Sequence, residues 1–281
     1  MRKGKNIIMK YSTLCLISIL LIASCTETID LQLNTGDNLQ LVVDAWIDDS
    51  DRRQLIELSL TSDYFNSEAP TTATGATIVM TSSSSGDTYT FSEESPGKYY
   101  MNKNLQGNPR DTYNLKINYQ TKEYSATHAL NRVPELLDID YIIVADSRIN
   151  TLSSVQYEIY ISFQEPDGKG DYYYVDNYHK YDGDNTNLYQ GNYSSDRFYD
   201  GEYLDHIFAT FGTGNRGDTI VTRLFSISKE AFEYVVDVDN QTEFRGFIFD
   251  SPPANVSTNI SNGGKGFFIV SAVSEYEKIL E

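Results

Sequence analysis

Cysteine is almost absent from this sequence. Its 281 residues include two cysteines, Cys15 and Cys25, and both lie near the N-terminus. The rest of the chain has no thiol, which excludes thiol catalysis, cysteine-bound zinc and iron–sulfur clusters there. It can form no disulfide either, so its stability has to come from an ordinary hydrophobic core.

The N-terminal apolar run is short. Residues 14–23 form a stretch of ten residues, whereas a transmembrane helix needs about 20. The stretch follows the basic residues Arg2, Lys3, Lys5 and Lys10. A basic start followed by a short apolar run is typical of a signal peptide.

The end of this run resembles a bacterial lipobox. The stretch LIASC at residues 21–25 places branched apolar residues and then small residues before a cysteine. This resemblance implies that residues 1–24 are a lipoprotein signal peptide and that Cys25 is lipidated and begins the mature chain. A plain signal peptide and a retained anchor helix are the alternatives.

Residues 25–38 are predicted to be a lipid tether, because they are polar and carry the acids Glu27, Asp30 and Asp37. Acidic residues shortly after a lipidated cysteine resemble the surface-export signal of Bacteroidota lipoproteins, which Glu27 matches loosely. The predicted localisation is therefore the outer membrane, with a lipid anchor, on either its cell-surface or its periplasmic face.

Basic residues are scarce. The chain has 40 acidic and 22 basic residues; four basic ones precede Cys25, which leaves 18 and a formal charge of −22 after cleavage. Such a charge disfavours nucleic acid and anionic membrane surfaces as partners. It leaves cations and neutral polar ligands open, and it also serves solubility.

From residue 39 the sequence alternates between polar residues and apolar or aromatic ones, as half-buried strands do. This predicts an antiparallel β-sandwich over residues 39–130, immunoglobulin-like or transthyretin-like, with Trp46 and Tyr113 in its core. The predicted strands are residues 39–48, 54–61, 75–82, 87–93, 97–102, 112–119 and 122–130.

Pro134 interrupts this rhythm, and a domain boundary is predicted near it. Residues 131–281 are predicted to form a second β-rich domain with one short helix at residues 228–239. Ser228 is the expected N-cap, and apolar residues recur on one face of that helix. The predicted strands of this part are residues 138–146, 155–165, 171–181, 202–211, 218–228 and 267–277.

Motifs for catalysis or cofactors are weak. GTGNRG at residues 212–217 fits the dinucleotide pattern, but a β-rich segment follows it, so a glycine-rich hairpin loop is predicted. Asp182 and Asp184 have the spacing of oxygen ligands, and a loose Ca²⁺ site there is a weak hypothesis, because the residues that complete a calcium-binding loop are missing. Asp167 and Asp171 are interpreted as parts of a hairpin turn.

No arrangement for nucleophilic catalysis stands out. The three histidines lie far apart in the sequence, and no G-x-S-x-G motif is present. The protein is therefore predicted to have no enzymatic activity and to need no cofactor, apart from the Ca²⁺ hypothesis.

Tyrosine, by contrast, is abundant between residues 172 and 203, with Asp, Asn and Gly between the rings. Tyrosine combines a large apolar face with a hydroxyl group, which suits recognition of a glycan or a peptide. The predicted ligand-binding residues are Tyr189, Tyr193, Arg197, Phe198 and Tyr199.

Several segments together resemble a family of Bacteroidota lipoproteins, domain of unknown function 4249. They are LVVDAWI at 41–47, SPGKYY at 95–100, SISKEAFEY at 226–234, SDYFNSEAP and GATI between 62 and 78, and SPPANVSTNISNGGKGFF at 251–268. Members are often encoded beside TonB-dependent receptors. The resemblance implies a role in uptake across the envelope and supplies no catalytic residue.

The function predicted from these observations is a non-enzymatic binding or accessory subunit of a TonB-dependent nutrient uptake system, anchored by lipid in the outer membrane. Its expected partner is the TonB-dependent outer-membrane receptor. Pro252, Pro253 and Asn255 then form either a docking loop or a structural corner. The alternatives are an envelope structural or adhesion lipoprotein without a small ligand, and a hydrolase in the second domain.

Overall fold

The computed structural model describes residues 39–62, 69–105, 107–149, 152–180, 191–242 and 256–281. These residues form fifteen strands, one 3-10 helix and one α-helix. For these residues, the prediction of a mostly β structure with one short α-helix is confirmed. The predicted signal peptide and tether, residues 1–38, lie outside the described residues.

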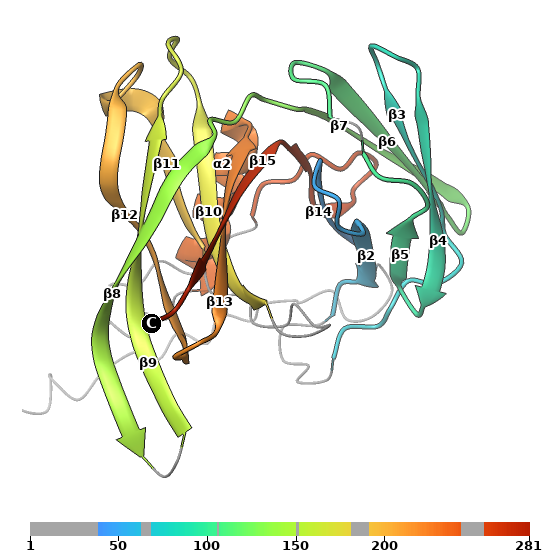
Figure 1. Ribbon diagram of the computed structural model, residues 1–281. Coiled ribbons are helices and arrows are strands. Elements are labelled where there is room, and N and C mark those ends of the chain that lie inside the picture. Colours follow the sequence, from blue (N-terminus) through green and yellow to red (C-terminus); the bar gives the residue numbers. More distant parts are fainter. Residues whose placement is uncertain (1–38, 63–68, 106, 150–151, 181–190, 243–255) are drawn as a thin grey trace, which may run out of the picture. The chain divides into compact units, whose positions relative to one another are not determined.

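An eight-stranded sheet contains the seven N-terminal strands and one strand from near the C-terminus (Figure 1). Its order is β14-β1-β2-β5-β4-β3-β6-β7; β1 and β14 pair in parallel, and the other neighbours are antiparallel. The strands are β1 (Leu41–Asp48), β2 (Leu55–Leu60), β3 (Thr77–Ser82), β4 (Thr88–Ser95), β5 (Lys98–Met101), β6 (Thr112–Tyr119), β7 (Lys122–Ala129) and β14 (Lys265–Ser271).

The alternating sequence explains why this sheet has one buried face. In β6 the residues Tyr113, Leu115, Ile117 and Tyr119 are buried and those between them are not. Because successive side chains point to opposite faces of a strand, one face packs into the core and the other meets water. The prediction that Tyr113 belongs to the core is confirmed.

The arrangement of these strands differs from the expected sandwich. The predicted strands are present, but hydrogen bonds join them into one continuous sheet that curls around its own core. The immunoglobulin-like or transthyretin-like sandwich over residues 39–130 is not confirmed. The sheet curls until its edge strands β7 and β14 meet, where the N–H of Val270 donates to Nδ1 of His128 at 3.1 Å.

Two smaller sheets pack on each other in the rest of the chain. One has the order β12-β9-β8, and the other has the order β11-β10-β13-β15. Buried rings and aliphatic side chains fill the layer between them, Tyr157, Phe163 and Tyr173 among them. The strands are β8 (Leu136–Ile149), β9 (Leu152–Gln164), β10 (Tyr172–Lys180), β11 (Asn192–Ser195), β12 (Tyr203–Asn215), β13 (Thr219–Ile227) and β15 (Val273–Ile279).

Strand β13 is buried on both faces. One face meets the three-stranded sheet, and the other packs against α2 (Lys229–Thr242) and β14 through Phe225 and Ile227. The helix starts as predicted, since Oγ of Ser228 accepts the N–H of Ala231 at 3.1 Å. A serine in this position satisfies a backbone donor that has no partner within the helix.

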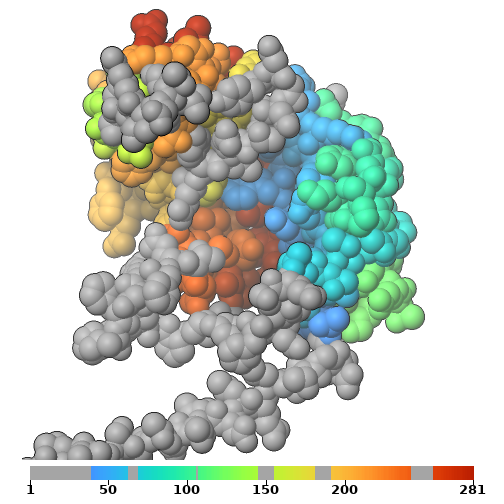
Figure 2. Space-filling model, turned by 90° about the horizontal axis from the view of Figure 1, so that it is seen from below, coloured from blue at the N-terminus to red at the C-terminus, as the bar shows by residue number. Residues whose placement is uncertain are grey.

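The single strand predicted at residues 267–277 is wrong in one respect. It is two strands, β14 and β15, which belong to different sheets and meet at Ala272. As a result, residues from near the C-terminus lie beside β1, close to the N-terminal end of the described chain, and Figure 2 shows red and blue atoms next to each other. The predicted domain division near residue 130 stays a prediction.

Among the described residues, no helix combines the length and the apolar character that a membrane span requires.

Candidate functional site

A pocket of about 450 Å³ lies between the turn after β1 and the strands β10 and β13. Trp46 and Leu55 line it from the eight-stranded sheet, and Tyr174 and Phe225 line it from the four-stranded sheet. The pocket therefore depends on how the two sheets meet. Its volume lies within the range of small-molecule sites.

Three aromatic rings form one wall of the pocket. The ring centroid of Trp46 lies 5.0 Å from that of Tyr174 and 5.5 Å from that of Phe225. Tyr174 and Phe225 are direct cross-strand partners, which fixes their spacing. The Nε1–H of Trp46 donates to Oγ of Ser271 at 3.1 Å and so holds the indole in place.

This position corrects the prediction for Trp46. The residue was expected to be a core anchor, yet it is half-buried and lines the pocket. Trp46 also packs against the buried hydrophobic cluster that contains Phe225. Its ring therefore combines packing on the protein with a surface open to the pocket.

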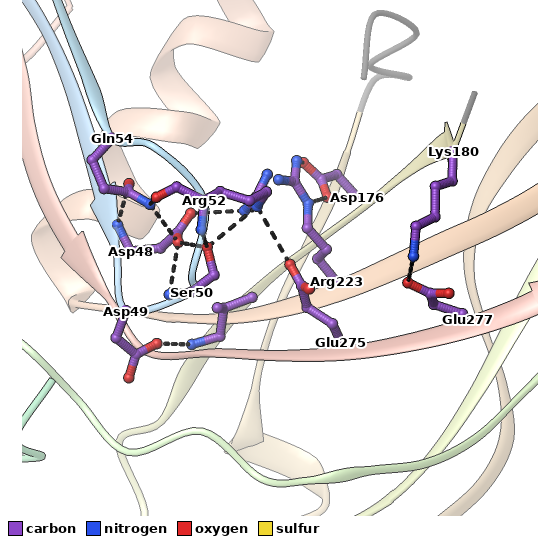
Figure 3. Close-up of polar contacts among 11 residues, drawn as sticks. Asp48, Asp49, Ser50, Arg52, Gln54, Asp176, Lys180, Arg223, Glu275 and Glu277 are labelled. Atoms are coloured by element: carbon purple, nitrogen blue, oxygen red, sulfur yellow. Dashed lines mark hydrogen bonds and ion pairs between the residues drawn. The ribbon is translucent and has the colours of Figure 1, made fainter. Parts of the chain in front are cut away.

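A row of charged residues runs along the polar side of the pocket, and Asp176 and Arg223 of this row line it. The strand register places Glu275 of β15 opposite Arg223 of β13, and Arg223 opposite Asp176 of β10. Arg223 donates from Nε to Oδ1 of Asp176 at 2.6 Å and from Nη2 to Oδ2 of the same carboxylate (Figure 3). Such bidentate pairing fixes the orientation of both groups.

Both members of this pair are buried. Burial raises the pKa of the Asp176 carboxyl above its ordinary value, whereas the nearby guanidinium of Arg52 lowers it. Because both carboxylate oxygens of Asp176 accept hydrogen bonds from Arg223, we treat the pair as ionised. The planar pair is therefore a rigid part of the pocket.

The turn after β1 closes the row with a second arginine. Arg52 donates from Nη2 to Oδ2 of Asp48 at 2.9 Å, and its Nε lies 3.5 Å from Oε1 of Glu275 (Figure 3). Gln54 holds Asp48 in turn, with Nε2 at 2.9 Å from Oδ1. Burial raises the pKa of Glu275, and Arg52 lowers it.

The chemistry of this site favours binding. Each arginine of the row contacts at least one carboxylate, and the carboxylates Asp48, Asp176 and Glu275 each lie within 4 Å of an arginine. Groups that neutralise one another act poorly as a free base or nucleophile. Aromatic faces beside fixed polar groups are typical of ligand recognition.

The predicted tyrosine site is only partly described. Tyr193 lies on β11, packs edge-on against Phe232 at 5.5 Å, and donates from its hydroxyl to Asp239 at 3.0 Å. Tyr199 is half-buried and donates to Oγ of Ser194 at 2.9 Å. Both hydroxyls therefore already bind protein groups.

Arg197 and Phe198 lie on the 3-10 helix η1 (Asp196–Phe198). Phe198 is 87% exposed, and the Arg197 guanidinium lies 5.3 Å from its ring centre. Arg197 also lines a second hollow of about 470 Å³ together with Tyr172 and Phe232. The structure thus brings Arg197 and Tyr193 near the same ring, Phe232, while Phe198 points to solvent.

Some predicted site residues lie outside the described residues. They are the lipidation residue Cys25, the ligand candidate Tyr189, the Ca²⁺ candidates Asp182 and Asp184, and the loop residues Pro252, Pro253 and Asn255.

The segment GTGNRG is not a separate loop. Residues 212–215 belong to β12, and the turn to β13 follows them. A Cβ atom on Gly212 would lie 2.2 Å from the ring of Tyr157, and one on Gly214 would lie 2.0 Å from the ring of His179. These glycines therefore allow close packing of two buried rings.

The grouping of these pocket residues could not be predicted from the sequence, because they come from distant segments. Asp176 and Arg223 are 47 positions apart, and Trp46 is more than 120 positions from Tyr174. One local feature could have indicated them. Arg223 and Asp176 are charged residues within segments that are otherwise rich in apolar and aromatic residues, and charged residues are rarely buried unless they are paired.

The fold and the pocket define a β-rich protein with a cavity of polar and aromatic residues where two sheets meet. The chain belongs to the family described as Domain of unknown function (DUF4249), whose model matches residues 26–277. No curated protein matches the chain.

Proposed function

We propose that this protein is a non-enzymatic glycan-binding lipoprotein of the outer membrane, and that it serves as an accessory subunit of a TonB-dependent uptake system. The observation that carries the binding function is the pocket, in which the rings of Trp46, Tyr174 and Phe225 stand beside the Asp176–Arg223 pair.

The pocket chemistry suits a sugar better than a charged ligand. An aromatic ring stacks on the apolar face of a pyranose, and planar carboxylate and guanidinium groups exchange hydrogen bonds with neighbouring hydroxyls. The charges around the pocket balance almost completely. Its lining has two carboxylates, Asp48 and Asp176, and three guanidinium groups, and two further acids, Glu275 and Glu94, lie beside Arg52 and Arg53. A neutral polar ligand therefore meets the smallest electrostatic penalty.

The location in the envelope is supported by the sequence. The lipobox-like stretch at residues 21–25 predicts a lipid on Cys25, and the acidic tether that follows predicts export to the outer membrane. The resemblance to lipoproteins encoded beside TonB-dependent receptors supports the partner.

Two measurements test this function. The purified protein, screened on an array of neutral and acidic glycans, is expected to bind a restricted set of neutral oligosaccharides. The native protein, extracted from membranes in mild detergent, is expected to co-purify with a TonB-dependent receptor identified by mass spectrometry. Binding to no glycan would contradict the ligand class, and repeated recovery of the protein alone would contradict the partner.

A further inference from the structure

A second polar cluster lies away from the pocket, where three carboxylates from separate segments meet. Glu165 directly follows β9, Asp171 directly precedes β10, and Asp196 is the first residue of η1. One carboxylate oxygen from each residue lies within 4.8 Å of the others. Glu165 is 1% exposed and Asp196 is 3% exposed.

The hydrogen bonds of the cluster leave one buried oxygen without a partner. The Tyr173 hydroxyl donates to Oε1 of Glu165 at 3.0 Å, but Oε2 of Glu165 has no hydrogen-bond partner among the described residues. The N–H of Gly170 donates to Oδ2 of Asp196 at 2.7 Å. A buried carboxylate oxygen without a hydrogen-bond partner is destabilising, so it requires an explanation.

The charges of the cluster are unbalanced as well. Arg132 donates to Oδ2 of Asp171 from Nε at 3.0 Å and from Nη2 at 2.7 Å, which supplies one positive charge to three carboxylates. Burial raises the pKa of the Glu165 carboxyl to about 7, the Tyr173 hydrogen bond opposes this, and the charges of Asp171 and Asp196 add to it. When all three acids are ionised, the cluster has a net charge of −2.

We propose that Glu165, Asp171 and Asp196 bind a divalent cation, Ca²⁺. Two oxygens on one Ca²⁺, each about 2.4 Å from it, can be at most about 4.8 Å apart, which the three carboxylates satisfy. Ca²⁺ prefers hard oxygen ligands and tolerates irregular geometry, with water completing its shell. The ion would give Oε2 of Glu165 a partner and cancel the excess charge.

The structural consequence is a link between three segments. The connection from β9 to β10 and the η1 segment would be held by one ion at the point where β10 begins. Asp196 also lines the hollow that contains Arg197 and Phe232. Ca²⁺ would therefore stabilise the segment that contains the tyrosines predicted to bind a ligand, independently of the Trp46 pocket.

Calorimetry and thermal unfolding of the full-length protein in detergent test this proposal. After removal of metal by EDTA, titration with CaCl₂ is expected to show one site with a dissociation constant on the order of 10⁻⁶–10⁻³ M. At 100 times that constant, Ca²⁺ is expected to raise Tm by roughly 5–10 °C. Tb³⁺ bound at the site is expected to luminesce on tyrosine excitation, because Tyr173 contacts Glu165.

Two variants and a control separate binding from folding. Glu165→Gln and Asp196→Asn are expected to abolish the calorimetric signal and the Ca²⁺-dependent shift in Tm. In EDTA, Glu165→Gln is expected to unfold at or above the wild-type Tm, because it removes a buried charge, which shows that the variant folds. Glu202→Gln changes an exposed acid in the same segment and is expected to bind Ca²⁺ like the wild type.

Three results would contradict the proposed Ca²⁺ site. If the wild type binds no Ca²⁺, the carboxylates share a proton rather than a metal ion, and the proposal is wrong. Unchanged Ca²⁺ binding by Glu165→Gln would place the ion elsewhere. Binding of Mg²⁺ but not Ca²⁺ would overturn the identity of the ion.

Discussion

The carboxylate of Asp176 and the guanidinium of Arg223 face each other across neighbouring strands, and both are buried beside the aromatic wall of the pocket. A buried ion pair contributes little net stability against apolar residues of the same size, but removing one partner leaves an uncompensated charge. Substitutions in the Asp176–Arg223 pair are therefore expected to affect stability and ligand binding in different ways.

Removal of one partner should destabilise the protein strongly. Asp176→Asn leaves Arg223 buried without its carboxylate and is expected to lower the free energy of unfolding by about 3–5 kcal/mol. The double variant Asp176→Leu/Arg223→Met is expected to regain most of this loss while it loses glycan binding. Urea unfolding of the single and double variants measures the difference; a double variant that is no more stable than Asp176→Asn would refute the prediction.

The glycine at position 266 should be essential for joining β14 to β1. It has a φ of +82°, and a Cβ atom there would lie 2.0 Å from the carbonyl oxygen of Val43. Gly86 is a matched control, because it has a φ of +74° but no atom within 4 Å of such a Cβ. Gly86→Ala is expected to lose about 1 kcal/mol, the penalty of the backbone conformation alone.

Gly266→Ala combines that penalty with a steric clash against backbone. It is expected to lose more than about 4 kcal/mol or to fail to fold. Thermal unfolding of the two variants side by side gives the answer. Equal losses in both would show that β14 does not approach β1 as closely as described.

His128 should make the stability depend on pH in the acidic range. Burial lowers its pKa from 6.5 to about 4, and the N–H of Val270 donates to its Nδ1. Between these two pKa values the unfolded chain binds a proton that the folded chain does not, so stability falls as the pH drops from 6.5 to 4. The full effect is roughly 3 kcal/mol.

The comparison with His128→Leu isolates this contribution. As the pH drops from 7 to 4, the wild type is expected to lose more unfolding free energy than the variant does. The stability of the wild type relative to the variant therefore falls over this range. Urea unfolding at several pH values follows that difference, because the remaining acids titrate alike in both proteins. A difference that stays constant with pH would mean that His128 is not held in its neutral form by the fold.

The lipid anchor can be tested at Cys25. Cys25→Ser removes the thiol that the predicted modification needs. The variant is expected to lose incorporation of labelled palmitate and to leave the membrane fraction, while the unrelated Cys15→Ser variant keeps both. Membrane attachment and labelling that survive in Cys25→Ser would refute lipidation at this residue.

Local sequence patterns predicted most of the strands and the helix. The alternation in residues 112–119 matches β6 at both ends, and the helix predicted at 228–239 is found at 229–242. These elements follow from side-chain periodicity and capping, which act over a few residues. Membership of the family, domain of unknown function 4249, was also predicted correctly, and that prediction rested on contiguous segments.

Local sequence patterns could not predict which distant segments pair or pack together. Nothing local shows that β14 pairs with β1, or that Ala272 separates two strands of different sheets. The pocket and the carboxylate cluster share this origin, since each is assembled from segments that only the tertiary structure brings together. Asp171 was interpreted as a turn residue for the same reason, although its carboxylate meets Glu165 and Asp196.

The affinity of the Trp46 pocket for its glycan tests the central claim most directly. Calorimetry with the best oligosaccharide from the array should show at least a tenfold loss of affinity for Trp46→Ala, which corresponds to about 1.4 kcal/mol. Trp46→Phe retains a ring and should lose less, and Phe198→Ala, which removes an exposed ring away from the pocket, should bind like the wild type. Wild-type affinity in a folded Trp46→Ala variant, or loss of binding in Phe198→Ala instead, would contradict the assignment of this pocket.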